Sequence, residues 1–90
     1  MAKSETDVWA TNTDWLDLTV VYPETANVPV NIQCKGPGNL VVFFSPSSTK
    51  PTDDSGWVRQ PLDDATGTAA HIYVKALDFA QVRLAVGLTD

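Results

Sequence analysis

Few side chains in this sequence could carry out chemistry. There is one histidine, His71, and one cysteine, Cys34. A Ser-His-Asp set needs a nucleophile held beside its base, but the serines that could serve all lie within residues 45–55, without a Gly-x-Ser-x-Gly turn. One cysteine and one histidine are also too few for a structural zinc site. We therefore predict no catalytic residue, no metal site, no cofactor and no enzyme activity.

Two pairs of adjacent acids, Asp53-Asp54 and Asp63-Asp64, leave a cation site as an alternative. Carboxylate oxygens are the ligands that calcium prefers. Neither pair lies in an Asp-x-Asp-x-Asp-Gly loop with a distal Glu, and aspartate is common in turns for reasons of backbone hydrogen bonding. The two pairs would form a cation site only if their loops met at one end of the fold.

The aromatic residues carry more information. Trp9, Trp15 and Trp57 all lie outside the runs of small aliphatic residues. They could plug the open ends of the fold, anchor an interface with another chain, or stack on a sugar. Trp9 lies in a polar segment that has no core of its own, which favours an interface. The predicted interface residues are Trp9, Trp15, Val41, Phe43, Trp57 and Tyr73.

The elements that must position these residues are strands. Apolar and polar residues alternate with a period of two and predict six strands, at about 15–21, 28–35, 40–44, 57–60, 70–76 and 80–88. This pattern places His71 on an outer face beside Tyr73 and Lys75, and Cys34 in the core. Residues 62–67 read as a turn-rich connection, and residues 45–55 as a projecting surface loop.

Gly36-Pro37-Gly38-Asn39 is a strong turn signal between two of these strands. Strands joined so tightly should form an antiparallel hairpin. The second of them, Leu40 to Phe44, is apolar throughout, which predicts burial on both sides. One side would face the core, and the other would face another chain or the N-terminal segment.

These patterns predict an all-β fold, a small antiparallel β-sandwich or compact jelly-roll-like barrel of six to seven strands with an extended N-terminal arm. The arm would comprise residues 1–14 and the sandwich domain residues 15–90. Its core should consist of inward-facing aliphatic residues and the cysteine. These are Leu16, Leu18, Val20, Val30, Ile32, Cys34, Val42, Ile72, Val74, Val82, Leu84 and Val86.

Length and charge exclude several classes of function. The chain has 90 residues and a formal net charge of −5, with only six Lys and Arg. This is one small domain, and its scattered cations argue against binding to nucleic acid. No apolar run reaches the roughly 20 residues of a membrane span, and the start lacks the apolar core of a signal peptide.

The predicted hydrophobic core is small, so self-association would add stability. We predict a homo-oligomer, with a trimer as one form it could take.

The order of five segments resembles that of small β-sandwich structural proteins of tailed bacteriophages. The segments are DWLDLTV, ANVPVNIQCKGPGNLVVFFS, TKPTDDSGWVRQPLDD, GTAAHIYVKAL and VRLAVG, which together span most of residues 14–88. The resemblance implies a non-enzymatic virion protein, made in the host bacterial cytoplasm, that decorates the capsid. Its arm and one sandwich face would bind other virion proteins and sister subunits. The alternatives are a neck or tail component, and a carbohydrate-binding or host-adhesion module that would use Trp57, Tyr73 and His71.

Overall fold

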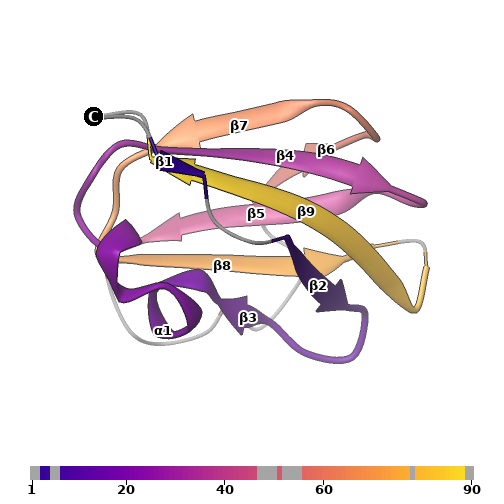
Figure 1. The fold of residues 1–90 in the computed structure, drawn as a ribbon. Helices are drawn as coiled ribbons and strands as arrows, with labels where there is room; N and C mark the ends of the chain where they lie inside the picture. Colours follow the sequence, from indigo (N-terminus) through magenta and orange to yellow (C-terminus); the bar gives the residue numbers. More distant parts are fainter. Residues whose placement is uncertain (1–2, 5–6, 47–50, 52–55, 78, 89–90) are drawn as a thin grey trace.

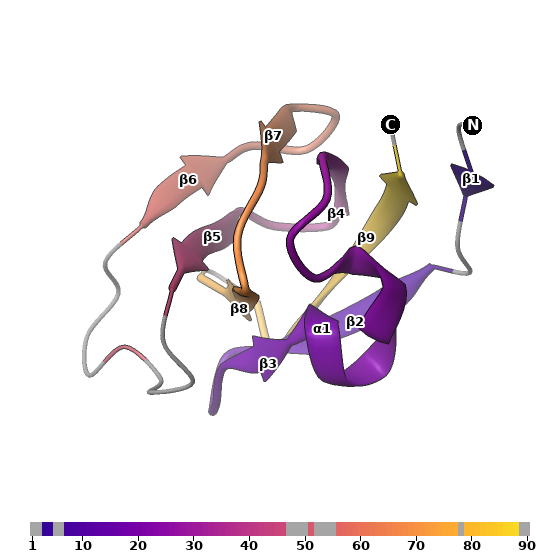
Figure 2. The ribbon, with the colours of Figure 1, turned by 90° about the vertical axis from the view of Figure 1, so that its left-hand side faces the viewer.

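The computed structural model of this chain describes residues 3–4, 7–46, 51, 56–77 and 79–88. Within these residues the regular structure is almost entirely β-strand, and the strands pair into two antiparallel sheets (Figure 1). The prediction of an all-β antiparallel fold is therefore confirmed, and the arrangement is sandwich-like. Figure 2 shows the two sheets as separate layers, with the helical turn α1 (Leu18–Val21) at one end.

The first sheet, sheet A, is built around two long strands, β9 (Gln81–Leu88) and β4 (Val30–Gly36). They pair antiparallel, with Ile32 opposite Val86. β7 (Asp64–Gly67) pairs with the other side of β4, while β1 (Lys3–Ser4) and β2 (Val8–Thr11) both pair with the other side of β9. Both central strands thus have neighbours on each side.

The second sheet, sheet B, has the strand order β3, β8, β5, β6. β8 (His71–Ala76) and β5 (Leu40–Ser45) form its centre, and β3 (Leu16–Asp17) pairs with β8 at one edge. β6 (Trp57–Arg59) pairs with β5 and forms the opposite edge. The sequence pattern had placed strands at all four of these positions.

The core lies between the two sheets, as the period-two pattern predicts. Ten predicted core residues are buried there: Leu18, Val30, Ile32, Cys34, Val42, Ile72, Val74, Val82, Leu84 and Val86. Leu16 is partly buried and packs against the same cluster. Four further residues of this cluster are buried but were not predicted as core: Ala10, Leu40, Ala65 and Ala76.

The predicted hairpin between residues 28–35 and 40–44 is wrong. β4 pairs with β9 and β7, whereas β5 pairs with β8 and β6, so the turn at 36–39 carries the chain from one sheet to the other. The end of β4 is bonded elsewhere: the amide of Cys34 donates to the carbonyl of Asp63 at 3.0 Å. Gly36 has a φ of +91°, and the register shifts between Cys34 and Gly36. Alternate burial looks the same for a hairpin and for a crossing between sheets, because both place every second residue in the core.

The strand predicted at 15–21 is also partly wrong. Only Leu16 and Asp17 are strand, and residues 18–21 form the turn α1, followed by a 3₁₀ turn, η1 (Pro23–Thr25). The Asp17 carboxylate accepts a hydrogen bond from the Thr19 amide at 2.9 Å, which is the capping contact that starts a helical turn. Val20 was predicted to lie in the core but is 74% exposed, since the turn rotates it outward.

Three strands were missed, and the shortest of them is β1 in the predicted arm. β7 was predicted as a connection because it contains one apolar residue, Ala65, which is buried against sheet B. β2 lies in the predicted arm, where no periodicity was visible; it pairs with β9 and buries Ala10 completely. The described part of the predicted arm at residues 8–11 is therefore a strand of sheet A.

Candidate functional site

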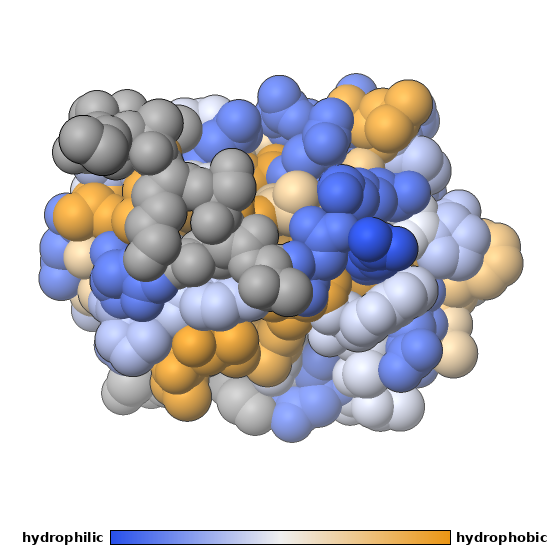
Figure 3. Space-filling model, viewed as in Figure 1, coloured by the Kyte–Doolittle hydropathy of each residue, from blue (hydrophilic) through white to orange (hydrophobic). Residues whose placement is uncertain are grey.

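The face of the molecule in Figure 3 shows hydrophobic side chains in separate patches with hydrophilic ones between them. Four places in the described part of the chain bring polar, aromatic or titratable groups together: the outer face of sheet B, the edge strand β6, the start of α1, and the outer face of sheet A.

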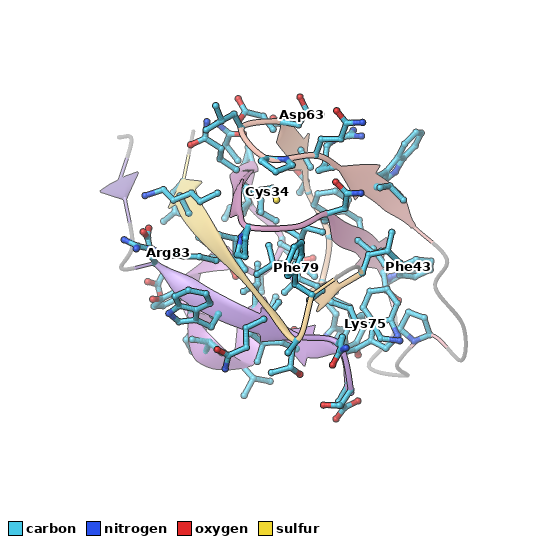
Figure 4. All side chains as sticks on the ribbon, turned by 90° about the vertical axis from the view of Figure 1, so that its right-hand side faces the viewer. Cys34, Phe43, Asp63, Lys75, Phe79 and Arg83 are labelled. Carbon is cyan, nitrogen blue, oxygen red and sulfur yellow. The ribbon has the colours of Figure 1, made fainter. Side chains whose placement is uncertain are left out.

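The outer face of sheet B carries a small aromatic cluster. Trp15, Val41 and Tyr73 are buried there, and Phe43 packs against them half-buried. The Lys75 ammonium lies 5.9 Å from the centre of the Trp15 ring, within the range of a cation–π contact. Figure 4 shows Phe43 and Lys75 on the same side of the molecule. The second side of the apolar strand β5 is thus covered by this chain's own Trp15 and Tyr73.

The edge strand β6 presents apolar side chains to solvent. Trp57 is 63% exposed and Val58 is 48% exposed. Val58 pairs with Val41 and so lies on the outer face of sheet B, whereas Trp57 pairs with Val42 and emerges on the other side of the strand. The Arg59 guanidinium lies 5.7 Å from the Trp57 ring centre, and its Nε donates to the Asp64 carbonyl at 2.7 Å. Arg59 therefore links β6 to β7 and helps to fix the position of the indole.

His71 has an acidic neighbour that the sequence analysis did not predict. Its Nδ1 lies 2.9 Å from Asp17 Oδ2 and 3.3 Å from Thr19 Oγ1, and the Thr19 hydroxyl donates to Asp17 Oδ1 at 2.6 Å. Burial alone would raise the pKa of Asp17, but the hydrogen bonds from Thr19 and His71 outweigh it and lower that pKa. In a catalytic triad the hydroxyl and the acid contact different ring nitrogens, whereas here both lie at Nδ1. The cluster is arranged to hold the start of α1.

The outer face of sheet A contains a polar groove over β4 and β9. It consists of two neighbouring hollows, of about 350 and 560 Å³, which share Gln33 and Lys35. Asn31 and Gln33 pair with Gly87 and Ala85, so the floor beside the two amide side chains is made of small residues. The second hollow extends to Trp9, Leu62 and Arg83. Trp9 pairs with Arg83, which places both on this outer face.

An ionic cluster joins the strands that form this groove. Asp7 Oδ2 lies 2.8 Å from Lys35 Nζ and 2.8 Å from Arg83 Nε. The hydrogen bonds from Lys35 and Arg83 hold the pKa of the Asp7 carboxyl below its ordinary value. Asp7 precedes β2, Lys35 is on β4 and Arg83 is on β9, so the cluster ties three strands together. Figure 4 shows Arg83 on the side of the molecule away from Phe43 and Lys75.

The remaining sequence-predicted residues lie as follows. Cys34 is fully buried in the core, and burial raises the pKa of its thiol, which is the opposite of what a nucleophile needs. Asp53-Asp54 and most of the 45–55 loop lie outside the described residues. Asp63 and Asp64 are exposed. No group of three His, Cys, Asp or Glu residues is close enough to hold a metal ion within the described part of the chain.

The structure therefore separates the six predicted interface residues into two groups. Trp15, Val41 and Tyr73 are buried within the single chain and Phe43 is half-buried, whereas Trp9 and Trp57 are exposed on different sheets. The groove residues were not predicted as a site. A signal was present, since the alternation placed Asn31, Gln33 and Lys35 on one polar side of a strand. The alternating pattern did not indicate the strand pairing that brings Arg83 and Asp7 beside these residues.

Comparisons with known proteins found no matching family model, curated protein or solved structure. Among the described residues no helix is long and apolar enough to cross a membrane.

Proposed function

We propose that this chain is a non-enzymatic structural protein of a tailed bacteriophage particle, and specifically a capsid decoration protein located in the virion. It would bind other virion proteins and copies of itself. The observation that carries the proposal is the pair of exposed apolar residues on the edge strand β6, Trp57 and Val58. A tryptophan that becomes buried on binding is a frequent hot spot of protein interfaces. The sequence resemblance to small phage structural proteins supports the same assignment.

The place of these residues in the sheet suits such an interface. β6 is the outermost strand of sheet B, and an edge strand is where a second chain can cover or extend a sheet. Because Trp57 and Val58 lie on opposite sides of this strand, a partner that covers the edge would contact both. Arg59 holds the indole in place, which reduces the entropy lost when the partner binds.

The titratable groups support a function without catalysis. The only thiol, Cys34, is buried with a raised pKa, and the His71 ring is held by Asp17 and Thr19 through one nitrogen. A cysteine nucleophile needs the opposite pKa shift. These groups are instead placed where they stabilise the fold.

The proposal is tested on purified particles of the virus that encodes the chain. We expect the protein in the particles, and its copy number decides its location: hundreds of copies indicate the capsid, whereas a few indicate a neck or tail component. Particles that lack the protein should bind the recombinant chain. A double variant, Trp57→Ser with Val58→Thr, should bind them roughly tenfold or more weakly, because a buried tryptophan is lost from the interface.

The matched control is Trp9→Ser, which removes an exposed tryptophan from the other sheet. It should bind particles like the wild type, and circular dichroism should show that both variants are folded. Deleting residues 1–12 is unsuitable, since it removes β2 and the buried Ala10. Absence of the protein from purified particles, or unchanged binding by the double variant, would contradict the proposal.

A further inference from the structure

The groove on the outer face of sheet A has no role in the assembly proposed above. We propose that it is a binding site for a neutral oligosaccharide, with Trp9 as the stacking platform and Asn31, Gln33 and Arg83 as the groups that bind sugar hydroxyls. This inference does not depend on the function of β6. It also differs from the sugar site expected from the sequence at Trp57, Tyr73 and His71, because Tyr73 is 1% exposed and cannot stack on a ligand.

The position of Trp9 is fixed by its neighbours in the strand. Val8 and Ala10 pair with the core residues Leu84 and Val82, so β2 is anchored and Trp9 must face outward. The indole is 49% exposed at one end of the groove. A flat aromatic surface beside polar side chains suits a sugar ring, which offers apolar C–H groups on its faces and hydroxyls around its edge.

The amide side chains are held so that each keeps a hydrogen-bonding group toward the groove. Asn31 Oδ1 accepts a hydrogen bond from the Thr66 hydroxyl at 3.3 Å, which leaves its amide N–H groups as donors. Gln33 Nε2 is 3.5 Å from the Leu62 carbonyl, which directs its oxygen away as an acceptor. Arg83 uses Nε toward Asp7, and its terminal nitrogens are further donors. The groove thus offers both donors and acceptors, which the hydroxyl groups of a sugar can use.

The charge of the groove favours a neutral ligand over an anionic one. Two carboxylates, Asp7 and Asp64, line it together with two cations, Lys35 and Arg83. Asp7 contacts both cations at 2.8 Å, and the two carboxylates together balance the positive charge that a polyanion would need. The whole chain has a net charge of −5, which adds to the repulsion of an anionic polymer.

The strand pairing favours a glycan over a peptide. A peptide commonly binds a sheet by adding a strand to a free edge. β4 and β9 lie below the groove, and each already pairs on both sides, so their backbone groups are used within the sheet. A ligand here must be recognised through side chains alone.

The size of the groove also suits a small ligand. Each hollow falls in the range of about 300 to 1,000 Å³ that is common for small-ligand sites.

The test is a binding titration of the full chain with maltotriose, cellotriose and tri-N-acetylchitotriose. Binding is measured by nuclear magnetic resonance and by calorimetry. A heparin hexasaccharide serves as the anionic probe. We expect saturable binding of at least one neutral trisaccharide, with amide shifts concentrated at residues 31–35 and 83–87. Trp9→Ala should weaken this binding about tenfold, as expected when an aromatic stacking surface is removed. Trp9→Phe should recover part of the affinity.

Trp57→Ala is the matched control, because it removes an exposed indole from the other sheet and should leave sugar binding unchanged. Thermal unfolding of each variant separates loss of the site from loss of the fold. The inference is overturned if no neutral trisaccharide binds at millimolar concentration, if only the heparin fragment binds, or if Trp9→Ala binds like the wild type. Occupation of the groove by a second copy of the chain, seen as concentration-dependent shifts at residues 31–35 without sugar, would also overturn it. None of these results bears on particle binding through Trp57.

Discussion

Asp17 is the residue that most changes the path of the chain. Its carboxylate accepts hydrogen bonds from the Thr19 amide and hydroxyl and contacts the His71 ring, so it joins α1 to β8. The sequence pattern treated it as an outward residue of a continuous strand. A capping aspartate and an outward aspartate have the same place in an alternating pattern, which is why the start of α1 could not be predicted.

We expect Asp17→Ala to lower the free energy of unfolding by about 1 kcal/mol at neutral pH, as for loss of a helix cap. Because the folded pKa of Asp17 lies below its ordinary value of 3.8, its contribution is complete above that value and is lost as pH falls through the folded pKa. The difference between variant and wild type should therefore shrink in acid. Urea unfolding at several pH values measures it. A difference that grows in acid would contradict this assignment.

The thiol of Cys34 should be unreactive in the folded protein. It is fully buried, its Sγ contacts the Gly38 carbonyl at 3.3 Å, and burial raises its pKa. A thiol reagent at pH 8 should modify it only on unfolding, because reaction requires an accessible thiolate. Modification measured across a guanidinium series should follow the loss of tryptophan fluorescence. Rapid modification without denaturant would show that the core opens around β4.

At the scale of elements, the long strands were predictable, whereas of the short ones only β3 and β6 were. β4, β5, β8 and β9 each alternate or run apolar over five or more residues, which is enough to define a strand with a buried face. β7 buries only Ala65, and it forms a strand because its backbone pairs with that of β4. Such a strand depends on tertiary pairing, and its own residues do not indicate it.

Two aliphatic residues of α1, Leu18 and Val20, test the correction to this segment. Leu18→Ala should lower the free energy of unfolding by about 2 to 5 kcal/mol, since it leaves a cavity in the core. Val20→Ala should change it by less than about 0.5 kcal/mol, because Val20 is exposed. Chemical denaturation of both variants makes the comparison. A large loss from Val20→Ala would restore the strand originally predicted for residues 15–21.

Gly56 sets the start of β6. Its φ is +132°, and a Cβ there would lie 2.5 Å from the Val42 carbonyl oxygen. Gly56→Ala should therefore destabilise the fold by more than about 1 kcal/mol and displace β6. Gly36→Ala is the control, since φ is +91° but the added Cβ would meet only ordinary contacts near 3.5 Å. If Gly56→Ala proved no more harmful than Gly36→Ala, β6 would not be held as closely to β5 as described.

At the scale of the whole molecule, the sequence predicted which faces of the strands are buried but not which strands pair with each other. The faces of β4 and β9 were correctly predicted, but the turn at 36–39 was assigned to a hairpin within one sheet. The polar side of β4 was visible in the sequence as Asn31, Gln33 and Lys35. The groove required Trp9 and Arg83 as well, which are far away in the chain and come together only through β9. Local patterns contain no information about such pairings.

We predict that the chain associates with copies of itself through β6. Native mass spectrometry and size-exclusion chromatography at micromolar concentration should show an oligomer. Its unfolding temperature should rise with protein concentration, because association stabilises the folded chain. The variant Trp57→Ser with Val58→Thr should be monomeric, while Trp9→Ser should assemble like the wild type. A wild-type monomer at all these concentrations would contradict self-association.

The pairing of β9 has a further consequence for how the protein is made. β9 lies between β4 on one side and β1 and β2 on the other. These three earlier strands therefore cannot complete their pairing until residues 81–88 are present. On a ribosome, sheet A cannot close until that segment has left the exit tunnel. Until then the edges of β2 and β4 that pair with β9 have no partner, and the closing contacts span nearly the whole described chain. Folding should therefore be slow for a domain of this size and should be completed only after synthesis of β9.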